Sequence, residues 1–212
     1  MRSAGMECWR TAQTPARPAR LLASPIALIG MPGGGKSTVG RHLARRLGQG
    51  FVDTDAVIER RIGCPIRTFF EQEGEERFRD IETDVLGELI QIQQTVIATG
   101  GGIVLREANR AALRDRTVCI YLRSTPEELF RRLRHDTKRP LLQVTDPLAR
   151  LRELFAKRDP LYREAAHFAI ETGRPSVPAL VNMILMQLEL AGLVDPSAVP
   201  SLVDAPTGDT SH

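Results

Sequence analysis

Residues 26–47 of the chain read IALIGMPGGGKSTVGRHLARRL. The apolar run Ile26–Ile29 ends in glycines and predicts a short buried strand. Apolar residues fall on one helical face of Lys36–Leu47, and Gly48 follows, which predicts an amphipathic helix with a glycine stop. Between them, Gly30–Ser37 fits the pattern G-x-x-x-x-G-K-[ST] of a phosphate-binding loop. A strand before this loop and a helix after it are the context that the motif requires.

Each residue type in this loop has a chemical role. Glycines allow backbone amides to converge on phosphate oxygens without side chains in the way. The lysine reaches the β- and γ-phosphates, and the serine hydroxyl binds Mg²⁺. The helix that follows turns its positive end toward the phosphates. We therefore expect an ATP site and a Mg²⁺ cofactor here, with ATP bound by Gly33, Gly34, Gly35, Lys36, Ser37 and Thr38.

The rest of the chain alternates strands with helices. Four more strands are expected at Phe51–Val52, Val96–Thr99, Thr117–Leu122 and His167–Ile170. Helices are expected at 55–61, 65–72, 75–91, 106–113, from 125, at 147–165 with a break or kink at Pro160, and at 177–190. This alternation predicts an α/β fold of three layers, α/β/α, around a five-stranded parallel sheet.

Three segments lack hydrophobic periodicity. Residues 1–24 are rich in Arg, Pro and Ala, and we predict that they and the tail at 194–212 are disordered on either side of a folded domain at 25–193. The charged stretch 134–146 is predicted to be a mobile lid.

Composition limits the function classes. The 212 residues suit one domain, and their net charge of +3 suits ligands that carry phosphate or carboxylate. We find no nucleic-acid recognition motif, and the apolar runs are shorter than the roughly 20 residues of a membrane span. Cys8, Cys64 and Cys119 lack metal-site spacing and suit a reducing compartment, so a cytoplasmic protein is expected.

Two carboxylates follow the second predicted strand. An enzyme with this loop needs an acid near Mg²⁺, and Asp53 and Asp55 are candidates. Alternatively, Asp53 or Thr54 could simply cap the next helix. Their spacing alone does not decide between these roles.

Six short motifs in the same order resemble those of the shikimate kinase family. They are Gly30–Gly40, Asp53–Asp55, Gly74–Glu82, Thr99–Gly102, Arg139–Leu142 and Arg158–Tyr162, and the resemblance spans roughly residues 26–190. It implies a monomeric phosphate-loop kinase that uses ATP and Mg²⁺ to phosphorylate the 3-hydroxyl of shikimate in aromatic amino-acid biosynthesis.

The resemblance also implies roles for single residues. Asp53 acts on Mg²⁺ with Ser37, and Asp55 binds the ring hydroxyls nearest the attacking oxygen, as positioner or base. Arg79 and Arg158 hold the carboxylate of shikimate, with Glu82 as a partner that orients Arg79.

The remaining roles fall on glycines and arginines. Glycines Gly100, Gly101 and Gly102 let the backbone approach the ring. Arg139 lies in the lid and reaches both substrates. Arg132 stacks on adenine, and Arg174 is the candidate for a second adenine contact. With Lys36, we expect Asp55 and Arg139 to be catalytic.

Two other readings remain. A gluconate-type kinase would share the fold, although the paired arginines and Gly100–Gly102 argue against it. A non-catalytic nucleotide-binding module is the other, and the intact Lys36, Ser37, Asp53 and Asp55 argue against it.

Overall fold

A computed structural model of the chain describes residues 24–133, 146–173 and 175–194. The predicted extension, lid and tail therefore fall almost wholly outside the described residues. Arg139 and Arg174, to which the sequence assigns contacts with ATP, also lie outside them.

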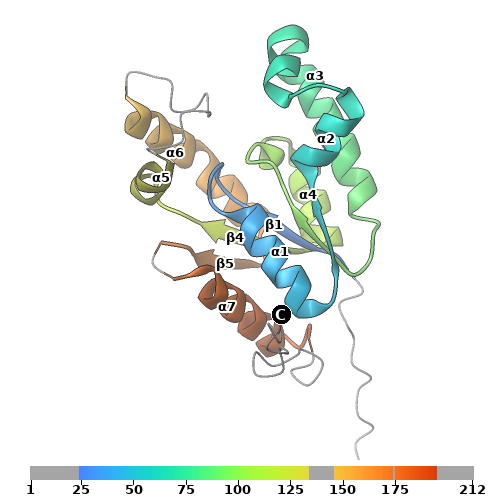
Figure 1. Cartoon of the computed structure of the whole chain (residues 1–212), viewed down its shortest axis with the longest axis vertical. Coiled ribbons are helices and arrows are strands. Elements are labelled where there is room, and N and C mark those ends of the chain that lie inside the picture. The colour runs from blue at the N-terminus through green and yellow to red at the C-terminus, as the bar shows by residue number, and fades with distance from the viewer. Residues whose placement is uncertain (1–23, 134–145, 174, 195–212) are drawn as a thin grey trace, which may run out of the picture.

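Five parallel strands form one sheet (Figure 1), in the order β2-β3-β1-β4-β5. The prediction of a five-stranded parallel sheet is confirmed, and each strand lies within one residue of its predicted bounds or contains them. The strands are β1 Ile26–Ile29, β2 Gly50–Asp53, β3 Thr95–Ala98, β4 Val118–Arg123 and β5 Phe168–Glu171.

Helices cover both faces of the sheet. They are α1 Lys36–Leu47, α2 Thr54–Ile62, α3 Ile66–Leu89, α4 Glu107–Arg116, α5 Pro126–Leu133, α6 Pro147–Ala165 and α7 Val177–Leu190, with a short 3₁₀ helix, η1, at Ile103–Leu105. Helices α1 and α7 pack on one face, and α3, α4, α5 and α6 contribute to the core on the other. This is the predicted three-layer arrangement.

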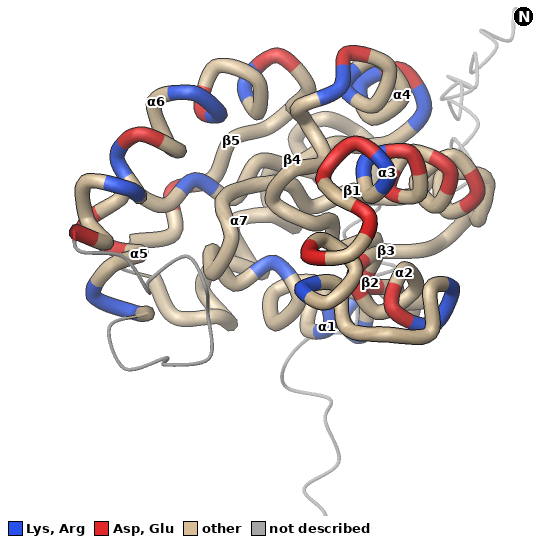
Figure 2. Tube along the Cα trace, turned by 90° about the horizontal axis from the view of Figure 1, so that it is seen from above, with Lys and Arg blue, Asp and Glu red and all other residues tan. Residues whose placement is uncertain are grey.

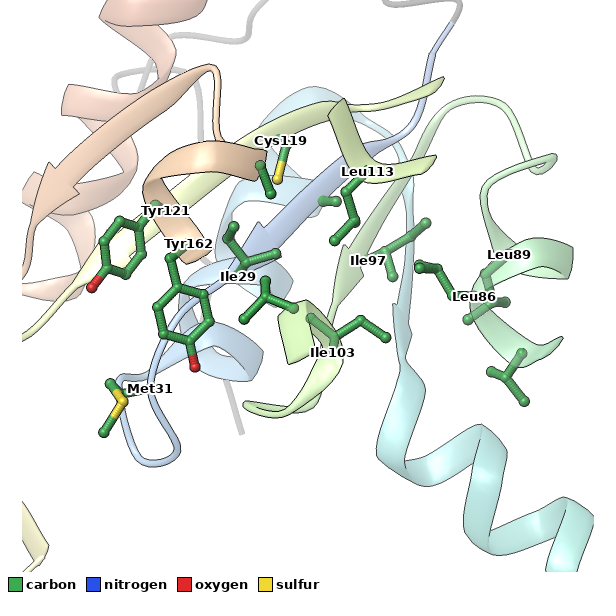
Figure 3. Packing of buried hydrophobic residues seen from close by; sticks show 14 of the residues in the cluster. Ile29, Met31, Leu86, Leu89, Ile97, Ile103, Leu113, Cys119, Tyr121 and Tyr162 are labelled. Carbon is green, nitrogen blue, oxygen red and sulfur yellow. The ribbon is translucent and has the colours of Figure 1, made fainter. Parts of the chain in front are cut away.

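Strand β1 divides the core into two clusters because successive side chains of a strand point to opposite faces. Ala27 and Ile29 face the cluster that includes α3 and α6 (Figure 3), whereas Ile26 and Leu28 face the one with α1 and α7. All four residues are buried. The apolar run of β1 therefore reflects burial on both faces of a central strand.

Two helices differ from the sequence prediction in detail. The two helices predicted at 65–72 and 75–91 join into α3, but Gly74 between them has φ 81° and ψ 173°, outside the helical range. Helix α6 runs through Pro160 without the predicted break. A proline inside a helix costs about 3 kcal/mol. Burial of Tyr162 and Ala165 beyond the proline offsets this cost.

The topology brings the carboxyl ends of β2, β3 and β1 side by side. In a parallel sheet these ends form the edge where ligands bind. The three segments that follow them are Thr54–Asp55, Gly100–Gly102 and the phosphate-binding loop. Among the described residues, we find no helix with the length and apolarity needed to cross a membrane.

Candidate active site

The phosphate-binding loop joins β1 to the first turn of α1. Gly33 and Gly35 have φ angles of 80° and 87°, in the left-handed region that glycine adopts without strain. The amide of Gly34 donates to the carbonyl oxygen of Met31 over 3.1 Å and closes the turn. The loop therefore has the backbone shape that its glycines predict.

Lys36 lies at the floor of a cleft of about 440 Å³. Its side chain is largely buried, and Nζ donates to the carbonyl oxygens of Gly30 and Met31, each at 2.9 Å. The ammonium therefore lies beside the loop, within the cleft, where a phosphate bound by the loop would meet it. The cleft is lined by Pro32, Gly33, Gly35, Lys36, Ser37, Thr38, Asp53, Asp55, Thr99 and Gly101.

Asp53 makes two contacts with its two oxygens. Oδ2 accepts a hydrogen bond from the hydroxyl of Ser37 at 2.6 Å, and Oδ1 accepts one from the amide of Asp55 at 3.1 Å. The second contact caps the N-terminus of α2. Asp53 therefore caps α2 and also contacts Ser37, and the two roles do not exclude each other.

The pair Ser37 and Asp53 fits a magnesium ion. Mg²⁺ prefers oxygen ligands and usually takes one or two from the protein, with the rest from water and substrate phosphates. Within the described ranges, no group of three or more His, Cys, Asp and Glu side chains could hold a metal on its own. A hydroxyl and a carboxylate beside a phosphate loop suit an ion that arrives with a nucleotide.

Asp55 is accessible to solvent but stands between the walls of the cleft. Partial desolvation raises the pKa of its carboxyl above the ordinary 3.8, and the neighbouring charge of Asp53 raises it further. The cations Lys36 and Arg79 oppose this shift. A carboxylate with a raised pKa is a stronger proton acceptor than an ordinary aspartate.

The glycine segment after β3 passes close to the other site residues. The amide of Gly100 donates to the hydroxyl of Thr54, which is buried, over 2.9 Å. A Cβ on Gly100 would stand 2.7 Å from Oδ1 of Asp55, and one on Gly101 would stand 2.6 Å from Pro32. A side chain at either position would therefore displace a neighbour, Asp55 in the first case and Pro32 in the second.

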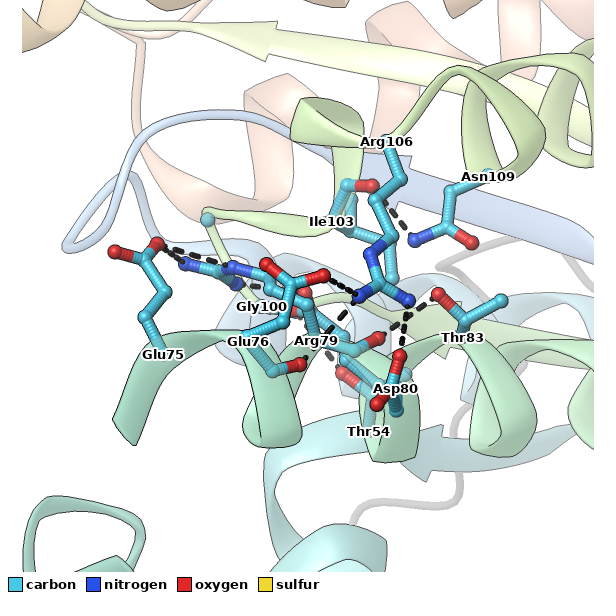
Figure 4. A network of polar contacts seen from close by, with 12 residues as sticks. Thr54, Glu75, Glu76, Arg79, Asp80, Thr83, Gly100, Ile103, Arg106 and Asn109 are labelled. Atoms are coloured by element: carbon cyan, nitrogen blue, oxygen red, sulfur yellow. Dashed lines mark hydrogen bonds and ion pairs between the residues drawn. The ribbon is translucent and has the colours of Figure 1, made fainter. Parts of the chain in front are cut away.

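Arg79 is held by two carboxylates of its own helix (Figure 4). Its guanidinium pairs with Glu82 at 2.6 Å and Glu75 at 2.9 Å. Burial raises the pKa of the Glu82 carboxyl, and the charge of Arg79 acts against that rise. The guanidinium also lies over the rings of Phe70 and Phe78. Glu82 is therefore placed to orient Arg79, and that role stays a prediction.

Acidic residues are concentrated along α3 (Figure 2), where they outnumber the three arginines Arg67, Arg77 and Arg79. Arg106, just after η1, forms ion pairs with Glu76 at 3.0 Å and Asp80 at 2.8 Å. These pairs tie the segment after the glycines to α3 (Figure 4). The helix that carries Arg79 is thereby fixed to the glycine segment.

Arg158 reaches the same glycine segment from α6. Its Nη1 donates to the carbonyl oxygen of Gly101 over 3.0 Å, and the hydroxyl of Tyr162 donates to that oxygen over 2.6 Å. A Cβ on Gly102 would overlap the guanidinium of Arg79. The structure therefore brings Arg79 and Arg158, far apart in the sequence, to one segment of three glycines.

Arg132 lies apart from this group. Its guanidinium donates to the backbone carbonyl of Thr172, in the segment after β5. The sequence assigns adenine contacts to Arg132 and to this segment, and the structure places the two in contact. Arg174, two residues beyond Thr172, is outside the described residues.

Sequence reasoning missed three residues that hold the site together: Thr54, Arg106 and Tyr162. Thr54 lies between the two candidate aspartates. Tyr162 follows Arg158 by four residues, a spacing that puts both on one helical face. That spacing predicts that Tyr162 lies beside Arg158, but nothing in the sequence indicates that this helical face contacts Gly101.

The fold and the cleft together define a phosphate-loop kinase with a small-molecule acceptor site. A family model described as Shikimate kinase matches residues 32–189. The chain is 61% identical over 175 residues to the shikimate kinase of Paracidovorax citrulli, covering 81% of this chain and 96% of that protein. It is 55% identical over 189 residues to that of Ralstonia nicotianae, covering 89% and 97%. The chain belongs to the shikimate kinase family and is an ATP-dependent enzyme.

Solved structures agree with this assignment. Shikimate kinase from Acinetobacter baumannii, in complex with shikimate, has a TM-score of 0.75 and 46% identity, covering 81% of this chain and 96% of that one. A gluconokinase from Sinorhizobium meliloti has a TM-score of 0.51 and 18% identity, covering 82% and 95%. The second likeness is one of fold alone, so family membership decides against the gluconate-type reading.

Proposed function

We propose that the cleft transfers the γ-phosphoryl group of ATP to the 3-hydroxyl of shikimate, with each residue in a defined role. One observation carries the proposal: Asp55 stands in one cleft with the phosphate loop, and the adjoining glycine segment contacts Arg158 and closely approaches Arg79. Shikimate offers one carboxylate and three hydroxyls. The guanidinium groups of arginines bind a carboxylate with two parallel hydrogen bonds, and the carboxylate of an aspartate accepts hydrogen bonds from hydroxyls.

The nucleotide side of the proposal rests on the loop. Its amides bind the phosphates, and Lys36 neutralises the charge that develops on the transferred group. Ser37 and Asp53 would hold Mg²⁺, and the ion would supply further charge neutralisation there. The hydrogen bond of 2.6 Å between the Ser37 hydroxyl and the Asp53 carboxylate supports a shared role of these two residues at the ion.

The acceptor side rests on Asp55. Its carboxylate orients the attacking hydroxyl and takes up the proton as the new O–P bond forms. The bond between Pγ and the bridging oxygen breaks, and ADP leaves with the electron pair. The raised pKa of Asp55 supports a role as proton acceptor, because a stronger base takes the proton earlier in the transfer.

The proposal extends to residues outside the described ranges. Arg139, in the proposed lid at 134–146, reaches both substrates when the lid closes and excludes water, which competes as a phosphoryl acceptor. Arg174 contacts adenine beside Arg132. We place the kinase domain at 25–193, in a cytoplasmic monomer. Light scattering after gel filtration tests the monomer, since a mass above 23.5 kDa contradicts it.

A coupled assay of ADP release tests the function. With ATP and Mg²⁺, we expect release to depend on shikimate, to saturate, and to stay near the blank with gluconate. A Lys36→Ala variant, purified in parallel, sets the blank for contaminating kinases. Equal rates with gluconate, or release that is independent of any acceptor, contradict the proposal.

A further inference from the structure

The chain contains only two tyrosines, and they stack on each other. Tyr121 lies on β4 and Tyr162 on α6, with ring centroids 4.9 Å apart and planes inclined at 28°. Both side chains are fully buried (Figure 3). The phosphoryl-transfer roles assigned above use neither ring.

The two hydroxyl groups have different partners. Tyr162 donates to the carbonyl oxygen of Gly101 at 2.6 Å, and Tyr121 donates to Oδ1 of Asp159 at 2.8 Å. Burial raises the pKa of both phenols, so both stay protonated and act as donors. The hydroxyl of Tyr162 therefore contacts the glycine segment, whereas the hydroxyl of Tyr121 contacts α6.

The contact of Tyr162 fixes the orientation of a peptide plane. In a trans peptide, the carbonyl of one residue and the amide of the next point in opposite directions, and the described residues include no cis peptide. Holding the Gly101 oxygen against α6 therefore turns the Gly102 amide away from α6. The same oxygen also accepts from Arg158, so this carbonyl sets the position of that guanidinium too.

Asp159 anchors this part of α6 independently of Tyr121. Its carboxylate also accepts from Arg123 at 3.1 Å and from Arg163 at 2.7 Å. Loss of the Tyr121 hydroxyl thus leaves the carboxylate with two partners. The Tyr121 hydroxyl and the Tyr162 hydroxyl are equally buried, but only the second touches the glycine segment.

We propose that Tyr162 is a positioning residue for the acceptor: its hydroxyl orients the Gly101–Gly102 peptide and, through the shared carbonyl, the guanidinium of Arg158. This rests on the proposed function, in which Arg158 and the glycines bind shikimate. Tyr162 touches neither reacting atom. Its removal therefore weakens shikimate binding and leaves the rate at saturation nearly unchanged.

The matched variants Tyr162→Phe and Tyr121→Phe test this proposal. Each removes one buried hydroxyl and keeps the stacked ring. For Tyr162→Phe, we expect the KM for shikimate to rise by about three- to tenfold, the effect of one hydrogen bond, with kcat and the KM for ATP within twofold of wild type. For Tyr121→Phe, we expect all three constants to stay within twofold.

Equal changes in both variants, or an unchanged KM in Tyr162→Phe, overturn the proposal because the hydroxyl then has only a structural role. Wild-type enzyme without shikimate-dependent ADP release overturns the proposed function itself, which is a separate result.

A second measurement tests the proposal if the Tyr162→Phe variant fails to fold. In Tyr121→Phe labelled with 3-fluorotyrosine, the single ¹⁹F resonance comes from Tyr162, and we expect shikimate to shift it. A resonance that shikimate leaves in place overturns the proposal.

Discussion

The substitution Gly102→Ala displaces a proposed binding residue without changing any charge. A Cβ at this position would overlap Nη1 of Arg79 and stand 2.6 Å from its Cζ, where ordinary contacts begin at 3.4 Å. The backbone of Gly102 has φ −96°, which alanine adopts freely, so strain arises only from this overlap. The guanidinium must move by roughly 1 Å, a misplacement that can cost on the order of 100-fold in activity.

Arg79 cannot move without losing contacts. Its guanidinium is bound by Glu82 and Glu75 and packs on Phe70 and Phe78, and only 11% of the side chain is exposed. We expect the displaced guanidinium to lose its bond to the carboxylate of shikimate. A hydrogen bond to a charged group contributes about 1.5–3 kcal/mol. The predicted result is a loss of about 10- to 150-fold in kcat/KM for shikimate, mostly in KM.

The coupled ADP assay over a range of shikimate concentrations measures this loss. Gly87→Ala is the matched control, because Gly87 lies on the exposed face of α3 with no atom near a new Cβ. Alanine in a helix is favoured over glycine by about 0.5–1 kcal/mol, so the control keeps its kinetics and gains stability. A Gly102→Ala enzyme with wild-type KM for shikimate would refute the assignment of Arg79 to the carboxylate.

Three further predictions concern the other charged residues. Lys36→Ala loses at least about 100-fold in kcat, since one preorganised charge contact contributes about 2.7–4 kcal/mol, and circular dichroism will show whether the fold is kept. Near-normal turnover in the folded variant contradicts the role of the loop. Arg158→Ala raises the KM for shikimate and leaves the KM for ATP unchanged, and steady-state kinetics in both substrates will detect any other pattern. The raised pKa of Asp55 requires kcat to fall with decreasing pH at a higher pH than an ordinary aspartate would give. Glu59→Gln removes a charge that contributes to this rise, so the acid limb moves to lower pH while the plateau is kept; an unmoved limb means that Asp55 does not control it.

The sequence predicted the fold well because the strands are short apolar runs, and the first three end at or near a glycine or an aspartate. The run Ile26–Ile29 and the pattern of Lys36–Leu47 agree with the structure to the residue. The break that Pro160 predicted as one of two outcomes is absent, since helix propensity is a local property and the burial of Tyr162 beyond the proline is a tertiary one. The strand order could not be read either, because it depends on which crossovers pack together.

The candidate site was predictable by residue type but not by contact. Spacing identified the loop and the aspartates, and the resemblance added Arg79 and Arg158. The contact of Tyr162 with Gly101 depends on how α6 meets the end of β3, which no local pattern encodes. The double use of Asp53, as helix cap and as partner of Ser37, also required coordinates.

The proposed reaction places phosphate from ATP on the 3-hydroxyl of shikimate. Proton and ³¹P NMR of the product, after complete conversion with Mg²⁺-ATP, identifies the oxygen that carries the phosphate. We expect one phosphomonoester per ADP formed, with the phosphorus coupled to the proton on carbon 3. A phosphorus coupled to another ring proton, or inorganic phosphate in place of the ester, would contradict it.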